Sequence, residues 1–170
     1  LKPEDAWLTD FGIDWHSRSD GAWSLSAQLD VFYNRLKDKI ISAPSPDDPW
    51  VWLPYNVGRV EAWGADASLA LRYEGDAWKG GLSARYARQS ALDKTPDSAS
   101  YDQQIPYVAK NTVVLAGDIS RAGWRLDALW NWRGGRFDAT GELPAWNTLD
   151  LSLGKTFTVC DAASLTLSVT

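Results

Sequence analysis

The residues from Trp124 to Arg133 alternate between an apolar face and a mostly polar face. A period of two is typical of a β-strand, because successive side chains of an extended chain point to opposite faces. The apolar face carries tryptophan near both of its ends, whereas the other face carries two arginines and an aspartate. Tryptophan rings at both ends of an apolar stripe are typical of strands that cross a bilayer, so the pattern predicts a transmembrane strand.

The same alternation recurs along the chain and predicts eight consecutive strands without a helical pattern. The predicted strands are 6–16, 23–36, 57–73, 78–89, 107–119, 124–133, 146–157 and 164–169. Short turns alternate with three long polar connections, 37–55, 90–106 and 134–145. The prolines of 37–55 argue against a paired central strand there. The sequence therefore predicts an all-β, up-and-down antiparallel transmembrane β-barrel wall with short turns at one end and long loops at the other.

Aromatic residues at the strand ends support the membrane interpretation. Six of the seven residues that flank the short turns are aromatic; the seven are Trp15, Trp23, Tyr73, Trp78, Ile119, Trp124 and Phe157. A second group lies toward the long loops: Trp7, Tyr107, Trp130 and Trp132. Two such groups predict the aromatic belts of a membrane barrel, with short turns in the periplasm and long loops outside the cell.

The alternation also assigns the two faces of the sheet. It predicts that Leu29, Leu71, Leu126 and Leu151 face lipid, whereas Asp30, Arg72, Asp127 and Asp150 face the lumen. A soluble β-sandwich or a lipocalin-like barrel also alternates, with its apolar face as the core and its polar face in solvent. The sequence pattern leaves that alternative open.

Composition excludes several functional classes. The net charge is −5, the pI is about 4.8, and the 17 lysines and arginines are scattered, so no nucleic-acid partner is expected. Cys160 and His16 are the only cysteine and the only histidine. We therefore predict no catalytic residue, no metal site and no cofactor. Asp10 and Asp14 could form a carboxylate pair in an enzyme, but lumen-facing polar residues are the simpler interpretation.

The ends of the sequence suggest a segment of a longer protein. The chain begins without methionine, inside an apparent motif, and stops inside a predicted strand. We expect residues 1–170 to be a partial β-barrel domain.

Three motifs resemble the C-terminal half of TonB-dependent outer-membrane receptors. Leu1-Lys2-Pro3-Glu4 with Asp10 and Gly12 is similar to the family's LKPE…ExG entry into a strand. Asn56-Val57-Gly58 with Gly64-Ala65-Asp66 resembles its N-x-G…G-x-E strand, and both motifs carry Asp for the usual Glu. Gln104-Ile105-Pro106-Tyr107 resembles its IPY-x-P-x-H segment, with Ala109 and Asn111 in place of Pro and His. The resemblance covers essentially the whole chain.

The resemblance implies eight strands of a larger barrel, of about 22 strands, whose lumen is closed by a plug domain. The plug, the TonB-contacting segment and the closing C-terminal strand would lie outside this sequence. The implied function is active uptake of a scarce large nutrient across the outer membrane of a Gram-negative bacterium. Ferric siderophores, cobalamin and haem are the implied ligands, and TonB would act through the plug.

Candidate ligand contacts lie in two of the long loops. They are Trp50, Trp52 and Tyr55 in the first loop, and Arg133 and Arg136 at the third. Aromatic rings suit a flat or catecholate ligand, and arginine suits an anionic one. A passive porin or a small structural barrel without a plug remains the alternative function.

Overall fold

The computed structural model describes residues 1–17, 21–45, 48, 50–138, 141–160 and 163–170. The strands in these ranges are β1 (Asp5–His16), β2 (Trp23–Pro44), β3 (Trp52–Glu74), β4 (Lys79–Asp93), β5 (Asn111–Arg121), β6 (Trp124–Arg133), β7 (Arg136–Phe137), β8 (Glu142–Leu143), β9 (Trp146–Cys160) and β10 (Ala163–Val169). No helix in the described ranges is long and apolar enough to span a membrane.

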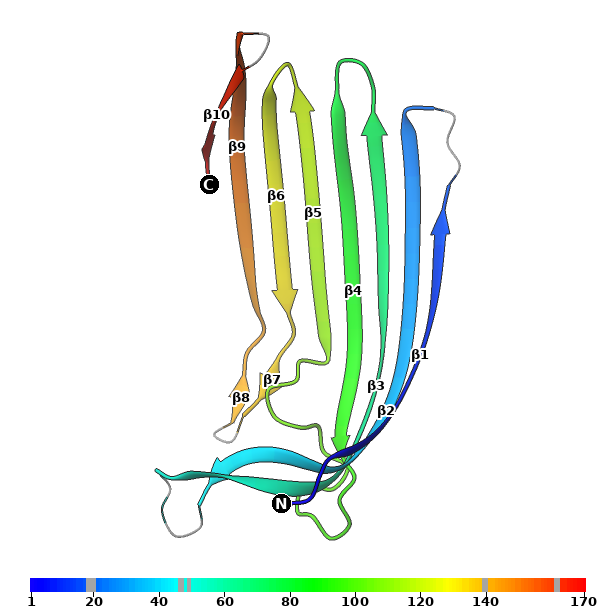
Figure 1. Cartoon of the computed structure of the whole chain (residues 1–170), viewed down its shortest axis with the longest axis vertical. Helices are drawn as coiled ribbons and strands as arrows, with labels where there is room; N and C mark the ends of the chain where they lie inside the picture. Colours follow the sequence, from blue (N-terminus) through cyan, green and yellow to red (C-terminus); the bar gives the residue numbers. More distant parts are fainter. Residues whose placement is uncertain (18–20, 46–47, 49, 139–140, 161–162) are drawn as a thin grey trace.

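Eight of the strands form one antiparallel sheet in the order β1-β2-β3-β4-β5-β6-β9-β10. Figure 1 shows them side by side, with the short turns at the top and the longer connections at the bottom. The predicted eight-stranded meander is confirmed. The sheet is open, because β1 pairs only with β2 and β10 only with β9.

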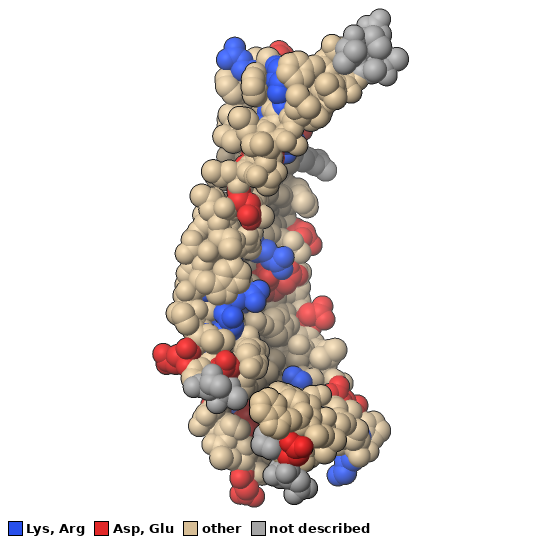
Figure 2. All heavy atoms as spheres, turned by 90° about the vertical axis from the view of Figure 1, so that its left-hand side faces the viewer, with Lys and Arg blue, Asp and Glu red and all other residues tan. Residues whose placement is uncertain are grey.

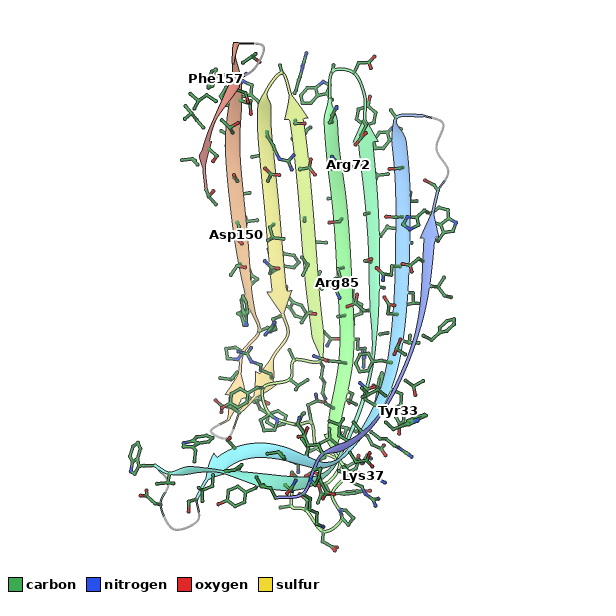
Figure 3. All side chains as sticks on the ribbon, viewed as in Figure 1. Tyr33, Lys37, Arg72, Arg85, Asp150 and Phe157 are labelled. Carbon is green, nitrogen blue, oxygen red and sulfur yellow. The ribbon has the colours of Figure 1, made fainter. Side chains whose placement is uncertain are left out.

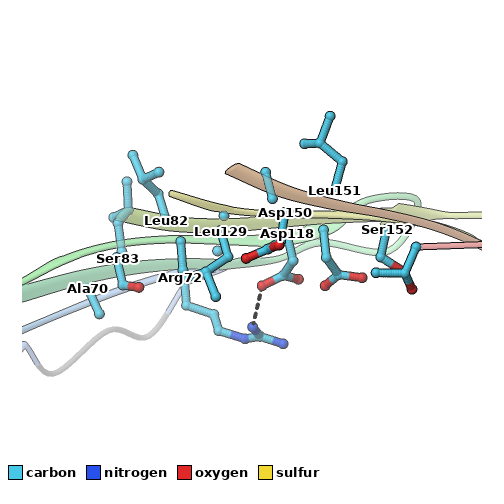
Figure 4. Close-up of a pocket in the computed structure, with 16 residues that line it drawn as sticks. Ala70, Arg72, Leu82, Ser83, Asp118, Leu129, Asp150, Leu151 and Ser152 are labelled. Atoms are coloured by element: carbon cyan, nitrogen blue, oxygen red, sulfur yellow. Dashed lines mark hydrogen bonds and ion pairs between the residues drawn. The ribbon is translucent and has the colours of Figure 1, made fainter. Parts of the chain in front are cut away.

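Cross-strand register keeps like side chains on one face, as predicted. Leu29 of β2 lies between Ile13 and Ala67, whereas Asp30 lies between Gly12 and Asp66. Figure 4 shows the same separation edge-on, with Leu82 and Leu151 above the sheet and Arg72 and Asp118 below it. We call these the apolar face and the polar face.

The apolar face is not the core of a soluble fold. Among the described residues, the buried hydrophobic side chains are only Val60, Ala91 and Ala109, and no second layer covers the eight-stranded sheet. Large apolar side chains of every long strand are exposed, for example Leu29 at 45%. A continuous exposed apolar face of this extent marks contact with lipid or another partner. In the part of the chain that the structure describes, the apolar face is therefore not covered as the core of a soluble sandwich would be.

The short-turn end carries the aromatic belt that the sequence predicts. The ring centroids of Trp23 and Tyr73 lie 4.6 Å apart. Lys155 Nζ lies 5.1 Å from the centroid of the Trp124 ring and 5.7 Å from that of Phe157. Cations beside aromatic rings at one level are typical of the membrane–water boundary, where both groups reach water. Figure 3 places Phe157 at this end and Tyr33 at the opposite end.

The prediction that 37–55 is an unpaired loop is wrong. Lys39–Pro44 of β2 pairs with Trp52–Val57 of β3, as a two-stranded ribbon beyond the ends of their neighbours. Figure 1 shows the ribbon turning away from the other strands and running across the long-loop end. Each strand of the ribbon has only one partner strand, so both are edge strands, in which proline is tolerated. Pro54 therefore does not interrupt the hydrogen bonding of a central strand. Pro46 and Pro49 lie outside the described residues.

One predicted strand boundary is also wrong. Tyr107 was expected to begin a strand, but its φ of 65° is left-handed, and β5 begins only at Asn111. The connection 134–145 has the predicted bounds, because β6 ends at Arg133 and β9 begins at Trp146, and it contains the small hairpin β7–β8. Tyr107 joins the two segments, because its backbone N–H donates to the carbonyl of Phe137 at 2.8 Å.

The motif residues fix the base of the ribbon. Asn56 exchanges hydrogen bonds with the backbone of Lys2, at 2.7 and 2.9 Å, and also donates to the carbonyl of Asp38 at 2.6 Å. Gly58 leaves room for Thr95, whose Cγ2 would lie 2.4 Å from any added Cβ. The first two motifs therefore meet in one cluster, at the point where Asp38 adopts a positive φ and the ribbon bends.

Candidate functional site

The long-loop end holds all five residues that the sequence predicts as ligand contacts. Trp50 and Trp52 lie at the turn of the β2–β3 ribbon, and Trp50 is 91% exposed. Tyr55 lies further along β3, opposite Ile41, and is half-buried. The rings at the ribbon turn have little packing of their own, so they are available to contact another molecule.

The two arginines belong to a different segment of the long-loop end. Arg133 ends β6, and its guanidinium lies 5.8 Å from the centroid of the Trp146 ring. Arg136 begins β7. Among the described residues, no hydrogen bond or ring contact joins the aromatic group to either arginine. The structure therefore divides the predicted set into an aromatic ribbon tip and a cationic loop region.

A pocket of about 360 Å³ opens beside Arg136. Its lining residues are Gln104, Val108, Lys110, Gly135, Arg136, Phe137, Glu142, Leu143 and Pro144. They come from the segment before β5 and from the β7–β8 hairpin. We call this cavity the loop pocket. Sequence reasoning used Gln104 only as part of a motif and missed Lys110 and Glu142, because nothing in the pattern brings these two loops together.

Two donors of the loop pocket are buried and have no hydrogen-bond partner among the described residues: Gln104 Nε2 and Arg136 Nη1. Gln104 is only 8% exposed. Its Oε1 accepts from the backbone N–H of Ala91 at 3.2 Å and from Ser90 Oγ at 3.3 Å. The backbone N–H of Ala91 needs an acceptor, so the Oε1 atom of Gln104 must point toward β4. The Nε2 atom of Gln104 is therefore the one without a hydrogen-bond partner among the described residues.

The connection after β4 holds Gln104 in place. The Asp93 carboxylate accepts from Ser98 Oγ at 2.7 Å and from Ser100 Oγ at 2.6 Å. Burial raises the pKa of Asp93, but these hydroxyls and Thr95 together hold it well below its usual value. The Asp93 N–H donates to the carbonyl of Gln103 at 2.9 Å. The ionised carboxylate therefore folds the connection back so that Gln104 lies beside β4.

Below the loops, the polar face is a wall of paired charges. Arg85 donates to both oxygens of Asp66, at 2.6 to 2.9 Å. Arg72 Nη1 lies 3.4 Å from Asp118 Oδ1, the dashed contact in Figure 4. Figure 2, which views the molecule from the β10 side, shows charged residues over its middle and right and few along its left edge. Such a face suits a wetted lumen.

The described residues contain no group of three or more His, Cys, Asp or Glu side chains that could hold a metal ion. What the long-loop end offers is aromatic surface and cationic donors.

The comparisons with known proteins agree with this architecture. A family model described as TonB dependent receptor-like, beta-barrel matches residues 1–170. A search of curated proteins returned no match.

Proposed function

The chain belongs to the TonB-dependent receptor β-barrel family, and we propose that it forms part of the barrel wall of a receptor for a scarce large nutrient. Members of this family are outer-membrane transporters of Gram-negative bacteria, not enzymes, and they interact with a ligand and with TonB. The proposed nutrient is a ferric siderophore, cobalamin or haem. The proposed receptor also contains a plug domain and a closing strand beyond residues 1–170.

One structural observation supports the proposal most strongly. The sheet is a single layer with an exposed apolar face and a face of paired charges. A barrel wall between lipid and a wetted lumen needs this combination. The open edges of the sheet fit a wall that continues on both sides.

The candidate ligand contacts keep their proposed roles. In this proposal the long connections are extracellular, and the exposed rings of Trp50 and Trp52 stack on the incoming ligand, with Tyr55 behind them. Arg133 and Arg136 bind its anionic groups. TonB acts on the plug, which releases the ligand into the lumen beside the charged polar face.

Uptake by intact cells tests the proposal. The full-length receptor is expressed in cells that lack their own uptake systems, which are offered labelled ferric siderophores, cobalamin and haem. We expect one class of ligand to accumulate, and accumulation to stop when TonB is deleted or the inner membrane is de-energised. Cells without the receptor are the control. Accumulation that continues in de-energised cells would instead support the passive porin.

A further inference from the structure

We propose that the loop pocket is a binding subsite for an anionic, oxygen-rich group of the transported molecule, such as a carboxylate or a catecholate. The proposal rests on the proposed function only for the origin of the ligand. The binding chemistry is argued from Gln104, Arg136 and Lys110, none of which lies in the aromatic ribbon tip.

The first argument is the pair of unused donors. Gln104 Nε2 and Arg136 Nη1 are both buried, and neither has a hydrogen-bond partner among the described residues. A buried donor without an acceptor destabilises the fold, and more so when the group is charged. Two such donors lining one cavity are best explained by a guest that brings acceptor oxygens. The amide of Gln104 cannot be reversed, because Oε1 already accepts from Ala91.

The second argument is charge. Arg136 and Lys110 line the pocket with two positive charges, and Glu142 contributes one negative charge. None of the ion pairs found among the described residues involves these three side chains. The net positive charge favours an anionic guest. Hydrogen bonds from a guanidinium to an anionic oxygen are about twice as strong as neutral ones.

The third argument is shape. A volume of about 360 Å³ lies in the range of small-molecule sites, roughly 300–1,000 Å³. Val108, Phe137, Leu143 and Pro144 supply apolar walls around the few polar groups. This composition suits one substituent of a larger ligand, with its oxygens on the donors and its carbon skeleton against the walls.

The fourth argument is position. The β7–β8 hairpin has only two residues in each strand, and the backbone bond from Tyr107 to Phe137 joins it to the segment before β5. A guest in the loop pocket would therefore contact both of the segments that carry the donors.

Calorimetric titration of the purified full-length receptor in neutral detergent tests the subsite without any energised membrane. The probes are citrate, 2,3-dihydroxybenzoate, inorganic phosphate and, as a neutral control, glucose. We expect at least one of the two organic anions to bind and glucose not to bind. Arg136→Met should weaken that binding by about tenfold or more, because a charge-assisted hydrogen bond is lost.

Gln104→Glu is the more discriminating variant. It keeps the Oε1 that accepts from Ala91, replaces the free donor by an acceptor, and adds a negative charge to the cavity that Arg136 lines. We expect anion binding to be lost while the thermal unfolding temperature stays the same or rises. Arg59→Met, an exposed arginine outside the pocket, is the matched control and should bind like the unmodified receptor.

Equal anion binding in the unmodified receptor and in both pocket variants would overturn the subsite. Binding of phosphate without either organic anion would also overturn it and would favour the phosphate groups of surrounding lipids as the occupant. Because the titration needs no transport, uptake that proves independent of TonB would refute the proposed function and leave this result untouched.

Discussion

Replacing Leu29 by arginine in the full-length receptor should lower the free energy of unfolding by about 2–4 kcal/mol, the cost of arginine on the lipid face near the middle of the membrane. Leu29 lies between two aromatic residues on the same face of β2, six residues after Trp23 and four before Tyr33. Its cross-strand neighbours are Ile13 and Ala67, and its side chain is 45% exposed. No acidic side chain on that face opposes position 29, so the arginine would meet hydrocarbon.

Gln28→Arg is the matched control, one residue away on the polar face. Position 28 lies opposite Asp14 on β1 and Ser68 on β3, so the new cation meets a carboxylate. We expect a change of less than about 1 kcal/mol. The measurement is the urea midpoint of barrels folded into lipid vesicles, with the unmodified receptor alongside. Equal destabilisation by the two variants would contradict the assignment of the faces.

Residues 1–170 alone should not refold into a compact, heat-resistant monomer in detergent. The outer edges of β1 and β10 have no partner strand in the described sheet. An open edge cannot sit in lipid, because unpaired backbone N–H and C=O groups there cost several kcal/mol each. Closing the eight strands on themselves would leave a lumen only wide enough for side chains.

The residues of the polar face make self-closure less favourable still. This face is rich in small polar side chains, among them Ser24, Ser26, Ser68, Ser83, Ser152 and Ser168. Such residues suit a wide wetted wall better than a filled narrow core. The test is gel mobility before and after heating, with the full-length receptor refolded in parallel. A compact eight-stranded species from this segment would favour the small-barrel alternative.

Alternation predicted the sheet because it depends only on local geometry. A strand whose two faces meet different surroundings must show a period of two. This period shows that Leu29 and Asp30 lie on opposite faces, and the succession of such segments along the chain indicates the order of the strands. Phe32 is an exception to the alternation, because this apolar residue lies on the polar face, opposite Asp10 and Gly64. Its ring lies against Gly64 of β3, where a Cβ would approach it to 2.6 Å.

The features that the sequence missed depend on contacts between distant segments. The prolines of 37–55 suggested a loop, because the pattern does not show that the neighbouring strands end before the ribbon begins. The left-handed backbone of Tyr107 has no glycine to signal it. Gln104 and Arg136 are far apart in the chain, and only the folded loops bring them to one pocket. Of the loop pocket, the sequence analysis therefore predicted Arg136 as a ligand contact but not Gln104.

The central claim is that one face of this sheet meets lipid and the other meets the lumen. Spin labels placed singly at positions 125–131 of β6, in the full-length receptor in lipid vesicles, test it most directly. The account predicts high accessibility to oxygen, which partitions into lipid, at 126, 128 and 130, and low accessibility at 125, 127, 129 and 131. Accessibility without a period of two, or with the two sets of positions reversed, would contradict it.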